Sequence, residues 1–166
     1  MLYLKPLNAE DGEKEYAFFQ TLPPENGFMN PFYGISYDAF LARLPEYLSY
    51  ARGENLSPGR VAATTALLWE EDEIVGMFSL RHYLNEALRA GAGHIGCAIR
   101  PDLRGRGYAK AGLKLAVEYL RGLPDFDGEE IHLSCNKDNT PSLKTMLACG
   151  GYIHHTGPGR YFVRIP

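Results

Sequence analysis

GHIGCAIRPDLRGRGYAKAGLKLAVEYLR, residues 93–121, is the stretch of sequence that decides how this chain folds. Its first part, residues 94–100, is short and largely apolar, and it lies between Gly93 and Pro101. This is the pattern of a buried strand. Proline cannot donate a hydrogen bond to a neighbouring strand, so we expect the strand to end at Pro101.

A helix is predicted directly after the glycine-rich turn at residues 104–107, because apolar residues recur there at every third or fourth position. The apolar stripe consists of Ala109, Gly112, Leu113, Ala116, Val117 and Leu120. Lysine, glutamate and arginine occupy the opposite face. Gly122 and Pro124 are expected to end the helix.

The turn itself is suited to binding phosphate groups. A glycine turn that runs into a helix leaves backbone N–H groups unpaired, and the helix dipole adds positive charge there. Gly105 and Gly107 have no side chain to obstruct a ligand, and Arg104 and Arg106 can donate charge-assisted hydrogen bonds to phosphate oxygens. The turn has neither the Walker pattern nor the third glycine of G-x-G-x-x-G. We predict a pyrophosphate-binding turn; the alternative is an ordinary turn with solvated arginines.

The residues RGRGYA, 104–109, match R-x-x-G-x-[GA], the acetyl-CoA signature of the GNAT superfamily of N-acetyltransferases. The chain resembles this family along nearly its whole length: GHIGCAIRP is similar to its fourth strand, and CNKDNTPSLKTMLACGG to its fifth strand and next helix. The segments FMNPFYG, RHYLN and GHIG resemble a subgroup of bacterial predicted acetyltransferases. The resemblance implies one domain over residues 1–166, acetyl-CoA as cosubstrate, and a small-molecule or protein amine as acceptor.

Composition narrows the class of protein. The chain has 166 residues, 45% hydrophobic and 22% charged, which suits one globular domain. The net charge of −3 argues against broad nucleic-acid binding. The 3 cysteines are scattered, which predicts reduced thiols and a cytoplasmic location. No signal-peptide pattern and no apolar run of membrane-spanning length occurs in the sequence, so no membrane association is expected. Formation of a homodimer is an open alternative to a monomer.

The whole chain predicts an α/β fold of the α+β type: a GNAT-like mixed, mostly antiparallel twisted sheet of about six to seven strands with helices on both faces. Strands are expected at residues 2–7, 61–69, 73–84, 94–100, 131–135, 152–156 and 161–165. A tight hairpin is expected at Glu71-Asp72, although no glycine is present to favour such a turn. A right-handed parallel crossover is expected to join the strands at 93–100 and 131–135.

The other helices are expected at residues 8–22, from about 36 to 48, and 140–149, with a short helix or loop at 85–93. Asn8 and Ser36 are the expected N-caps of the first two helices. Pro45 predicts a kink or a break in the second. Residues 25–34 are expected to form an aromatic-rich loop.

The resemblance also implies which residues bind the cofactor. The backbone of the family's fourth strand contacts the pantetheine arm and the thioester carbonyl, and this role falls on Cys97, Ala98 and Ile99. The remaining cofactor-binding residues implied by the motifs are Arg104, Gly105, Arg106, Gly107, Tyr108, Ala109, Asn139 and Ser142. No metal is expected, because the histidines do not have a ligand spacing.

GNAT enzymes catalyse direct attack of the amine on the thioester in a ternary complex, so a base must accept the proton of the amine. His94 is the first candidate, because imidazole titrates near neutral pH; the alternative is a strand histidine that only forms structural hydrogen bonds. His82 and Tyr83 come next, Glu86 is weaker, and a chain of water molecules could replace any of them.

The general acid departs from the family pattern. In N-x-x-[AS]-x-x-x-Y, a tyrosine follows the capping asparagine by seven residues, but counting from Asn139 places Met146 there. Met146 is then a plain core residue. Tyr108, Tyr152 or solvent could protonate the thiolate instead.

The acceptor pocket is expected between the first helix pair, the aromatic loop, the RHYLN segment and the last hairpin. The predicted substrate-binding residues are Phe28, Asn30, Phe32, Tyr33, Arg81 and Asn85. The aromatic residues could equally form a local core, above all Phe32. Two functions without acetyl transfer also remain open: an acyl-CoA-binding sensor, and a phosphopeptide- or nucleotide-binding domain.

Overall fold

The computed structural model describes residues 1–25 and 28–166. The strands in these ranges are β1 (Leu2–Pro6), β2 (Ala63–Glu70), β3 (Glu73–Arg81), β4 (Ile95–Ile99), β5 (Ile131–Asn136), β6 (Tyr152–Thr156) and β7 (Arg160–Ile165). The helices are α1 (Gly12–Phe19), α2 (Tyr37–Ala51), α3 (Glu86–Arg89), α4 (Tyr108–Arg121) and α5 (Thr140–Ala148), with a 3₁₀ turn, η1, at Pro101–Leu103. None of the helices in these ranges is both long and apolar enough to cross a membrane.

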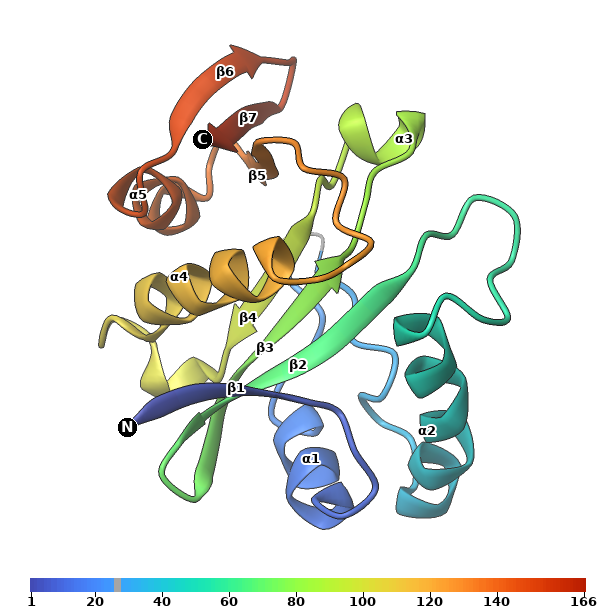
Figure 1. Cartoon of the computed structure of the whole chain (residues 1–166). Helices are drawn as coiled ribbons and strands as arrows, with labels where there is room; N and C mark the ends of the chain where they lie inside the picture. Colours follow the sequence, from blue (N-terminus) through green and yellow to red (C-terminus); the bar gives the residue numbers. More distant parts are fainter. Residues whose placement is uncertain (26–27) are drawn as a thin grey trace.

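The strands form two antiparallel sheets, β1-β2-β3-β4 and β5-β7-β6 (Figure 1). The predicted mixed α/β fold with mostly antiparallel strands is confirmed. The predicted single sheet is divided, however: α4 does connect β4 to β5, but the described residues contain one backbone hydrogen bond between the two strand regions. It runs from His94 N–H to the His132 carbonyl over 2.8 Å. The sheets therefore meet at one end and diverge toward the other.

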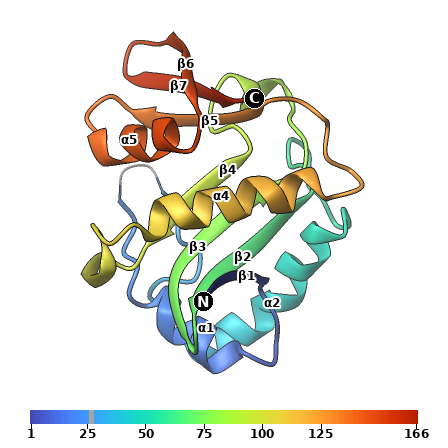
Figure 2. The same ribbon diagram turned by 60° about the vertical axis from the view of Figure 1, so that its left-hand side comes forward.

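Helices cover both faces, as predicted, and produce two cores (Figure 2). The first core lies between α4, α5 and one face of both sheets, with Phe78 and Leu133 among its buried residues. The second lies between α1, α2 and the opposite face of β1–β4, and includes Met77. Gly112 permits the close approach of α4, because a Cβ atom there would lie 2.5 Å from the Phe78 ring. We call the face of both sheets that is turned away from α4 and α5 the far face.

Two of the expected helix caps are present and one prediction is wrong. The Ser36 hydroxyl accepts a hydrogen bond from Ala39 N–H at 3.1 Å, and the Asn139 side chain accepts one from Ser142 N–H at 3.3 Å. The predicted start of the first helix is wrong, because Asn8 accepts from Asp11 N–H at 2.9 Å and holds a turn that precedes α1. The helix begins only at Gly12.

Two other local predictions are resolved by backbone geometry. Pro45 does not break the second helix, since α2 continues from Tyr37 to Ala51. The hairpin at Glu71-Asp72 forms without glycine, because Glu71 itself adopts a φ of +53°. Only a few per cent of non-glycine residues take this left-handed conformation.

A buried carboxyl group lies between α1 and the sheet. Glu15 is 1% exposed, and one of its oxygens accepts a hydrogen bond from Asn8 N–H at 3.0 Å. The other oxygen, Oε1, has no partner in the described part of the chain. Burial, which disfavours the ionised form, raises the pKa of Glu15 to about 7.

We predict that Glu15→Gln stabilises the protein at high pH. In the folded state Glu15 holds its proton up to about pH 7, against an ordinary value of 4.5, so its contribution to stability is lost as the pH rises between these values. At pH 8 the variant should gain up to about 3 kcal/mol of unfolding free energy, and the gain should vanish near pH 4.5. Denaturant melts at both pH values measure this. The exposed Glu13→Gln on the same helix is the control, and an equal pH dependence in the wild type and Glu15→Gln would contradict the prediction.

Candidate functional site

The free edge of β4 is the first component of the site. In the sheet order β4 pairs only with β3, and Arg100 N–H bonds to the Val75 carbonyl at 2.9 Å. Backbone groups alternate in direction along a strand, so Cys97 and Ile99 direct theirs toward β5. The side chain of Cys97 is exposed although Ile95 and Ile99 on the same face are 6% and 7% exposed. Solvent therefore reaches β4 where the sheets diverge.

The glycine turn at the end of this edge leads into α4, as predicted. Gly105 and Gly107 have φ angles of +80° and +85°, and no side chain caps the helix. The first helical bond runs from Ala111 N–H to the Gly107 carbonyl, so the N–H groups of the preceding turn have no helical partner. A Cβ atom at either glycine would meet nothing within 4 Å. An anionic group such as a pyrophosphate fits this open helix N-terminus.

The arginines near the turn differ in their availability. Arg104 donates from Nε to the Ile99 carbonyl at 3.1 Å, and its guanidinium forms an ion pair with Glu25 of the α1–α2 loop. Arg106 is exposed. Arg100 is paired with Asp102 at 2.7 Å and is held away from the turn. Sequence reasoning missed Glu25, which is 79 residues from Arg104 and has no local signal.

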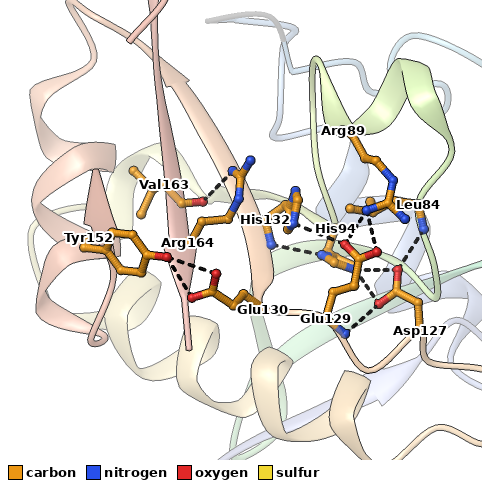
Figure 3. Close-up of polar contacts among 10 residues, drawn as sticks. All are labelled: Leu84, Arg89, His94, Asp127, Glu129, Glu130, His132, Tyr152, Val163 and Arg164. Carbon is orange, nitrogen blue, oxygen red and sulfur yellow. Dashed lines mark hydrogen bonds and ion pairs between the residues drawn. The ribbon is translucent and has the colours of Figure 1, made fainter. Parts of the chain in front are cut away.

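His94 lies at the closed end, where the two sheets meet (Figure 3). Its ring is fully buried, Nδ1 accepts a hydrogen bond from His132 N–H at 2.9 Å, and Nε2 lies 3.2 Å from Asp127 Oδ1. These partners require the neutral tautomer with its proton on Nε2. Burial lowers the pKa of His94 and outweighs the opposing effect of Asp127.

Neither ring nitrogen of His94 is free to take a proton in this conformation, because Nδ1 is an acceptor for backbone and Nε2 already carries a hydrogen. Asp127 also accepts hydrogen bonds from Leu84 N–H at 3.0 Å and from Glu129 N–H at 3.2 Å. The catalytic role of His94 stays a prediction, and its contacts favour the structural alternative.

His82 has a similar arrangement. It is 2% exposed, with Nε2 2.8 Å from the Thr64 hydroxyl and Nδ1 2.8 Å from Asp125. The Tyr83 hydroxyl accepts a weak hydrogen bond from Ala62 N–H at 3.4 Å. His82 and His94 each bind an aspartate of the loop after α4. Sequence reasoning missed both partners, Asp125 and Asp127, which lie close together in the loop after α4.

Met146, which takes the place of the family's tyrosine, and the two tyrosines considered for protonation of the thiolate have different surroundings. Met146 is 8% exposed and belongs to the first core. The Tyr152 hydroxyl donates to the Glu130 carboxylate at 2.8 Å, a hydrogen bond that raises the pKa of Tyr152. Tyr108, the first residue of α4, is half-buried against the first core.

The aromatic loop is divided between core and surface. Phe32 is fully buried, and its ring centroid lies 4.7 Å from that of Phe19 and 5.0 Å from that of Phe40. Asn30 ties the loop to α1 through hydrogen bonds of 2.8 Å to two carbonyl groups. Phe28 is half-buried and Tyr33 is exposed. The loop was predicted over residues 25–34, of which residues 26–27 lie outside the described ranges.

The other predicted binding residues have local partners. Arg81 donates to the Gly93 carbonyl at 3.1 Å. Asn85 caps α3 and donates to the Gly59 carbonyl at 2.9 Å. Ser142 is half-buried and meets Asn139 only through its own N–H. The structure thus brings together the free edge of β4 and the glycine turn, whereas His82 and His94 both contact the loop after α4.

Residues 29–150, more than half of the chain, match the family model described as "Acetyltransferase (GNAT) family". No curated protein sequence matches the chain significantly.

Solved acetyltransferase structures share the fold. A ribosomal-protein-S5-alanine acetyltransferase from Vibrio fischeri is 15% identical with a TM-score of 0.69, over 98% of this chain and 91% of that one. RimJ from Mycobacterium smegmatis, in complex with a CoA-disulfide, is 16% identical with a TM-score of 0.67, over 98% and 80%. A spermidine N-acetyltransferase chimera of Vibrio cholerae and hSSAT is 16% identical with a TM-score of 0.63, over 99% and 94%.

We predict that Glu25→Gln strengthens the binding of acetyl-CoA. The variant frees the Arg104 guanidinium from its ion pair, so phosphate oxygens no longer compete with a carboxylate. Because the pair is solvent-exposed, the dissociation constant should fall only about 2- to 5-fold, and the difference should shrink in high salt. Calorimetry at two salt concentrations measures this. Glu54→Gln, which removes the partner of Arg52, is the matched control; an unchanged affinity in Glu25→Gln would contradict the competition.

We predict that His94→Ala lowers the melting temperature, because it leaves the buried His132 N–H and the Asp127 carboxylate without their partner. If His94 is also the catalytic base, turnover of the fraction that remains folded should fall about 10²- to 10⁴-fold, and the pH profile should lose an ionisation. Turnover and folded fraction are measured on the same samples. Activity lost only in proportion to folded protein would contradict the catalytic role.

Proposed function

The chain belongs to the acetyltransferase (GNAT) family, and we propose that it transfers the acetyl group of acetyl-CoA to a primary amine by direct attack in a ternary complex. The observation that carries the proposal is the uncapped N-terminus of α4, with its two positive-φ glycines, at the end of the free β4 edge. This arrangement offers hydrogen-bond donors to a pyrophosphate and, next to it, an extended backbone for the pantetheine arm.

The proposed reaction needs few side chains. The amine nitrogen attacks the thioester carbon, a C–N bond forms, the C–S bond breaks, and the thiolate leaves. The outward-facing N–H groups of Cys97 and Ile99 can donate to the carbonyl oxygen as it gains negative charge. No covalent intermediate on the protein is required, which agrees with the lack of a paired nucleophile and base among the site residues described above.

Proton transfer is proposed to involve water. The acceptor's ammonium group first loses a proton to solvent at the exposed β4 edge, and the neutral amine attacks. The second proton, which the nitrogen loses as the amide forms, leaves by the same route. His94 and His82 are the alternatives from the sequence, but each has both ring nitrogens in contact with a partner. The thiolate is a stable leaving group and can take a proton from water. Water is proposed for this role because Met146 replaces the tyrosine of the family pattern. A cytoplasmic location is part of this proposal, supported by the three free cysteines.

We predict that acetyl-CoA raises the melting temperature strongly, whereas ATP and NAD do not, and that a panel of amines releases CoA from acetyl-CoA. Gly107→Asp should abolish both effects, since it places a carboxylate against the pyrophosphate. Gly59→Asp is the matched control: Gly59 has a φ of +84°, against +85° at Gly107, and a Cβ atom at either position meets nothing within 4 Å. Gly59→Asp therefore reproduces the backbone strain outside the glycine turn.

The affinity of the two variants decides the assignment. Calorimetry should show at least a ~100-fold weaker affinity for acetyl-CoA in Gly107→Asp, equivalent to two units of pKd at ~1.4 kcal/mol each. Wild-type affinity in Gly107→Asp would overturn the pyrophosphate site. Binding of acetyl-CoA without CoA release for any amine would contradict the enzyme and leave a binding function.

A further inference from the structure

The residues of β3, β4, β5 and β7 on the far face include arginines and no acidic residue, although Glu130, directly before β5, acts on Arg164. Alternation and register place these residues on this face: Met77, Ser79 and Arg81 of β3, Gly96 and Ala98 of β4, His132, Ser134 and Asn136 of β5, and Arg160, Phe162 and Arg164 of β7. Three of them are arginines, and none is aspartate or glutamate. An amine acceptor that is only cationic would find no carboxylate on these strands.

Arg160 is the arginine best placed to meet an acceptor. It pairs across β5 and β7 with Asn136, so it lies beyond the joined end of the sheets, where β4 and β5 have separated. Its guanidinium donates from one terminal nitrogen to Asn136 Oδ1 at 2.9 Å, and from the other to the Ser134 hydroxyl at 2.8 Å. Two neutral groups therefore hold the guanidinium, and no carboxylate of the described residues lies within ion-pair distance of it.

The hydrogen bonds of Arg160 leave donors free. A guanidinium has five N–H donors, of which two are used and one, at Nε, is buried without a partner. Each terminal nitrogen keeps one more N–H group, and the residue is half-buried. A guanidinium held in place by two hydrogen bonds can donate its remaining N–H groups to a carboxylate.

A second arginine, Arg81, lies near the loop at residues 91–93, which Arg160 reaches through Ser134. The Ser134 hydroxyl that accepts from Arg160 itself donates to the Gly91 carbonyl at 2.9 Å, and Arg81 donates to the Gly93 carbonyl at 3.1 Å. The two arginines thus flank the loop at residues 91–93. Burial away from water lowers the pKa of Arg81, with no carboxylate opposing this effect. An anion here would offset the cost of desolvating both charges.

The nearest acidic residues are engaged elsewhere. Glu130 accepts the Tyr152 hydroxyl, Glu129 pairs with Arg89, and Asp127 contacts His94. Figure 3 shows these contacts on both sides of His132, next to His94 and Arg164. They leave the positive charge of Arg160 uncompensated on the open side.

We propose that the acceptor of this enzyme carries a carboxylate as well as an amine, and that Arg160 binds the carboxylate on the far face while the amine approaches β4. The acceptor class is therefore small amino acids and related amino carboxylates. This inference rests on the proposed acetyl transfer, and it makes Arg160 a specificity residue that contacts the acceptor and not the cofactor.

The test compares amines that differ only in their carboxylate. The wild type is assayed by CoA release with a panel of α- and ω-amino acids, the corresponding amino acid amides, and the decarboxylated amines. We expect kcat/KM to be at least about 10-fold higher for the acids, the usual worth of a hydrogen bond to a charged group. Arg160→Gln should lower kcat/KM for the acids about 10- to 100-fold, change the amides less than about 3-fold, and leave acetyl-CoA affinity unaltered.

Two variants keep the experiment interpretable. Arg52→Gln removes an exposed arginine at the end of α2, far from the site, and should change neither class of acceptor. Arg160→Lys keeps the charge but loses the two-pronged geometry, so it should give an intermediate loss with the acids. It replaces Arg160→Gln if that variant does not fold.

The outcomes separate this inference from the proposed function. Wild-type turnover of amides or diamines that equals or exceeds that of the acids overturns the carboxylate site and leaves acetyl transfer standing. An equal loss for acids and amides in Arg160→Gln also overturns it. If acetyl-CoA binds but no amine of any class is acetylated, acetyl transfer is overturned, and the acceptor assignment with it.

Discussion

The hydrogen bond from His94 N–H to the His132 carbonyl is the constraint on which the rest of the structure depends, since it is the single backbone bond between the β4 and β5 regions in the described residues. In a continuous ladder, His132 N–H would bond to a backbone carbonyl of the neighbouring strand. It donates instead to the imidazole Nδ1 of His94. Pairing therefore stops after one step and the sheets diverge. The free edge of β4, on which the proposed function relies, exists because this ladder is interrupted.

The buried imidazole that interrupts the ladder is held by the loop after α4. Asp127 bonds to His94, and Asp125 bonds to His82 one strand away. Two histidines with carboxylate partners thus connect the ends of β3, β4 and β5 to one loop. Protonation of His94 would remove the acceptor that its Nδ1 offers to His132 N–H. His82 and His94 therefore lie at the closed end, and the proposed ligand sites lie at the open end.

Local charge, and not the net charge of −3, governs what the open end can bind. Arg104 and Arg106 flank an uncapped helix N-terminus on one side of the diverging sheets, and Arg160 lies on the far face of the other. Asp127, Glu129 and Glu130 are engaged near the closed end. Glu25 and Asp102 instead pair with Arg104 and Arg100 beside the glycine turn. The site therefore presents two separate positive regions, one suited to phosphates and one suited to the proposed carboxylate.

The sequence by itself determined the local elements and the glycine turn. The apolar periodicity predicted α4, and Ser36 and Asn139 predicted the starts of α2 and α5, because short-range patterns directly set backbone conformation and helix capping. The motif RGRGYA identified the family. The helix start predicted at Asn8 was wrong because an asparagine side chain can stabilise a turn as readily as it caps a helix. Only the tertiary structure decided that His94 is buried between Asp127 and His132, that Glu25 meets Arg104, and that Arg160 faces the open side without a carboxylate. These facts depend on contacts between residues 24 to 79 positions apart, whose geometry is set by how the two sheets pack, and no local pattern encodes that distance.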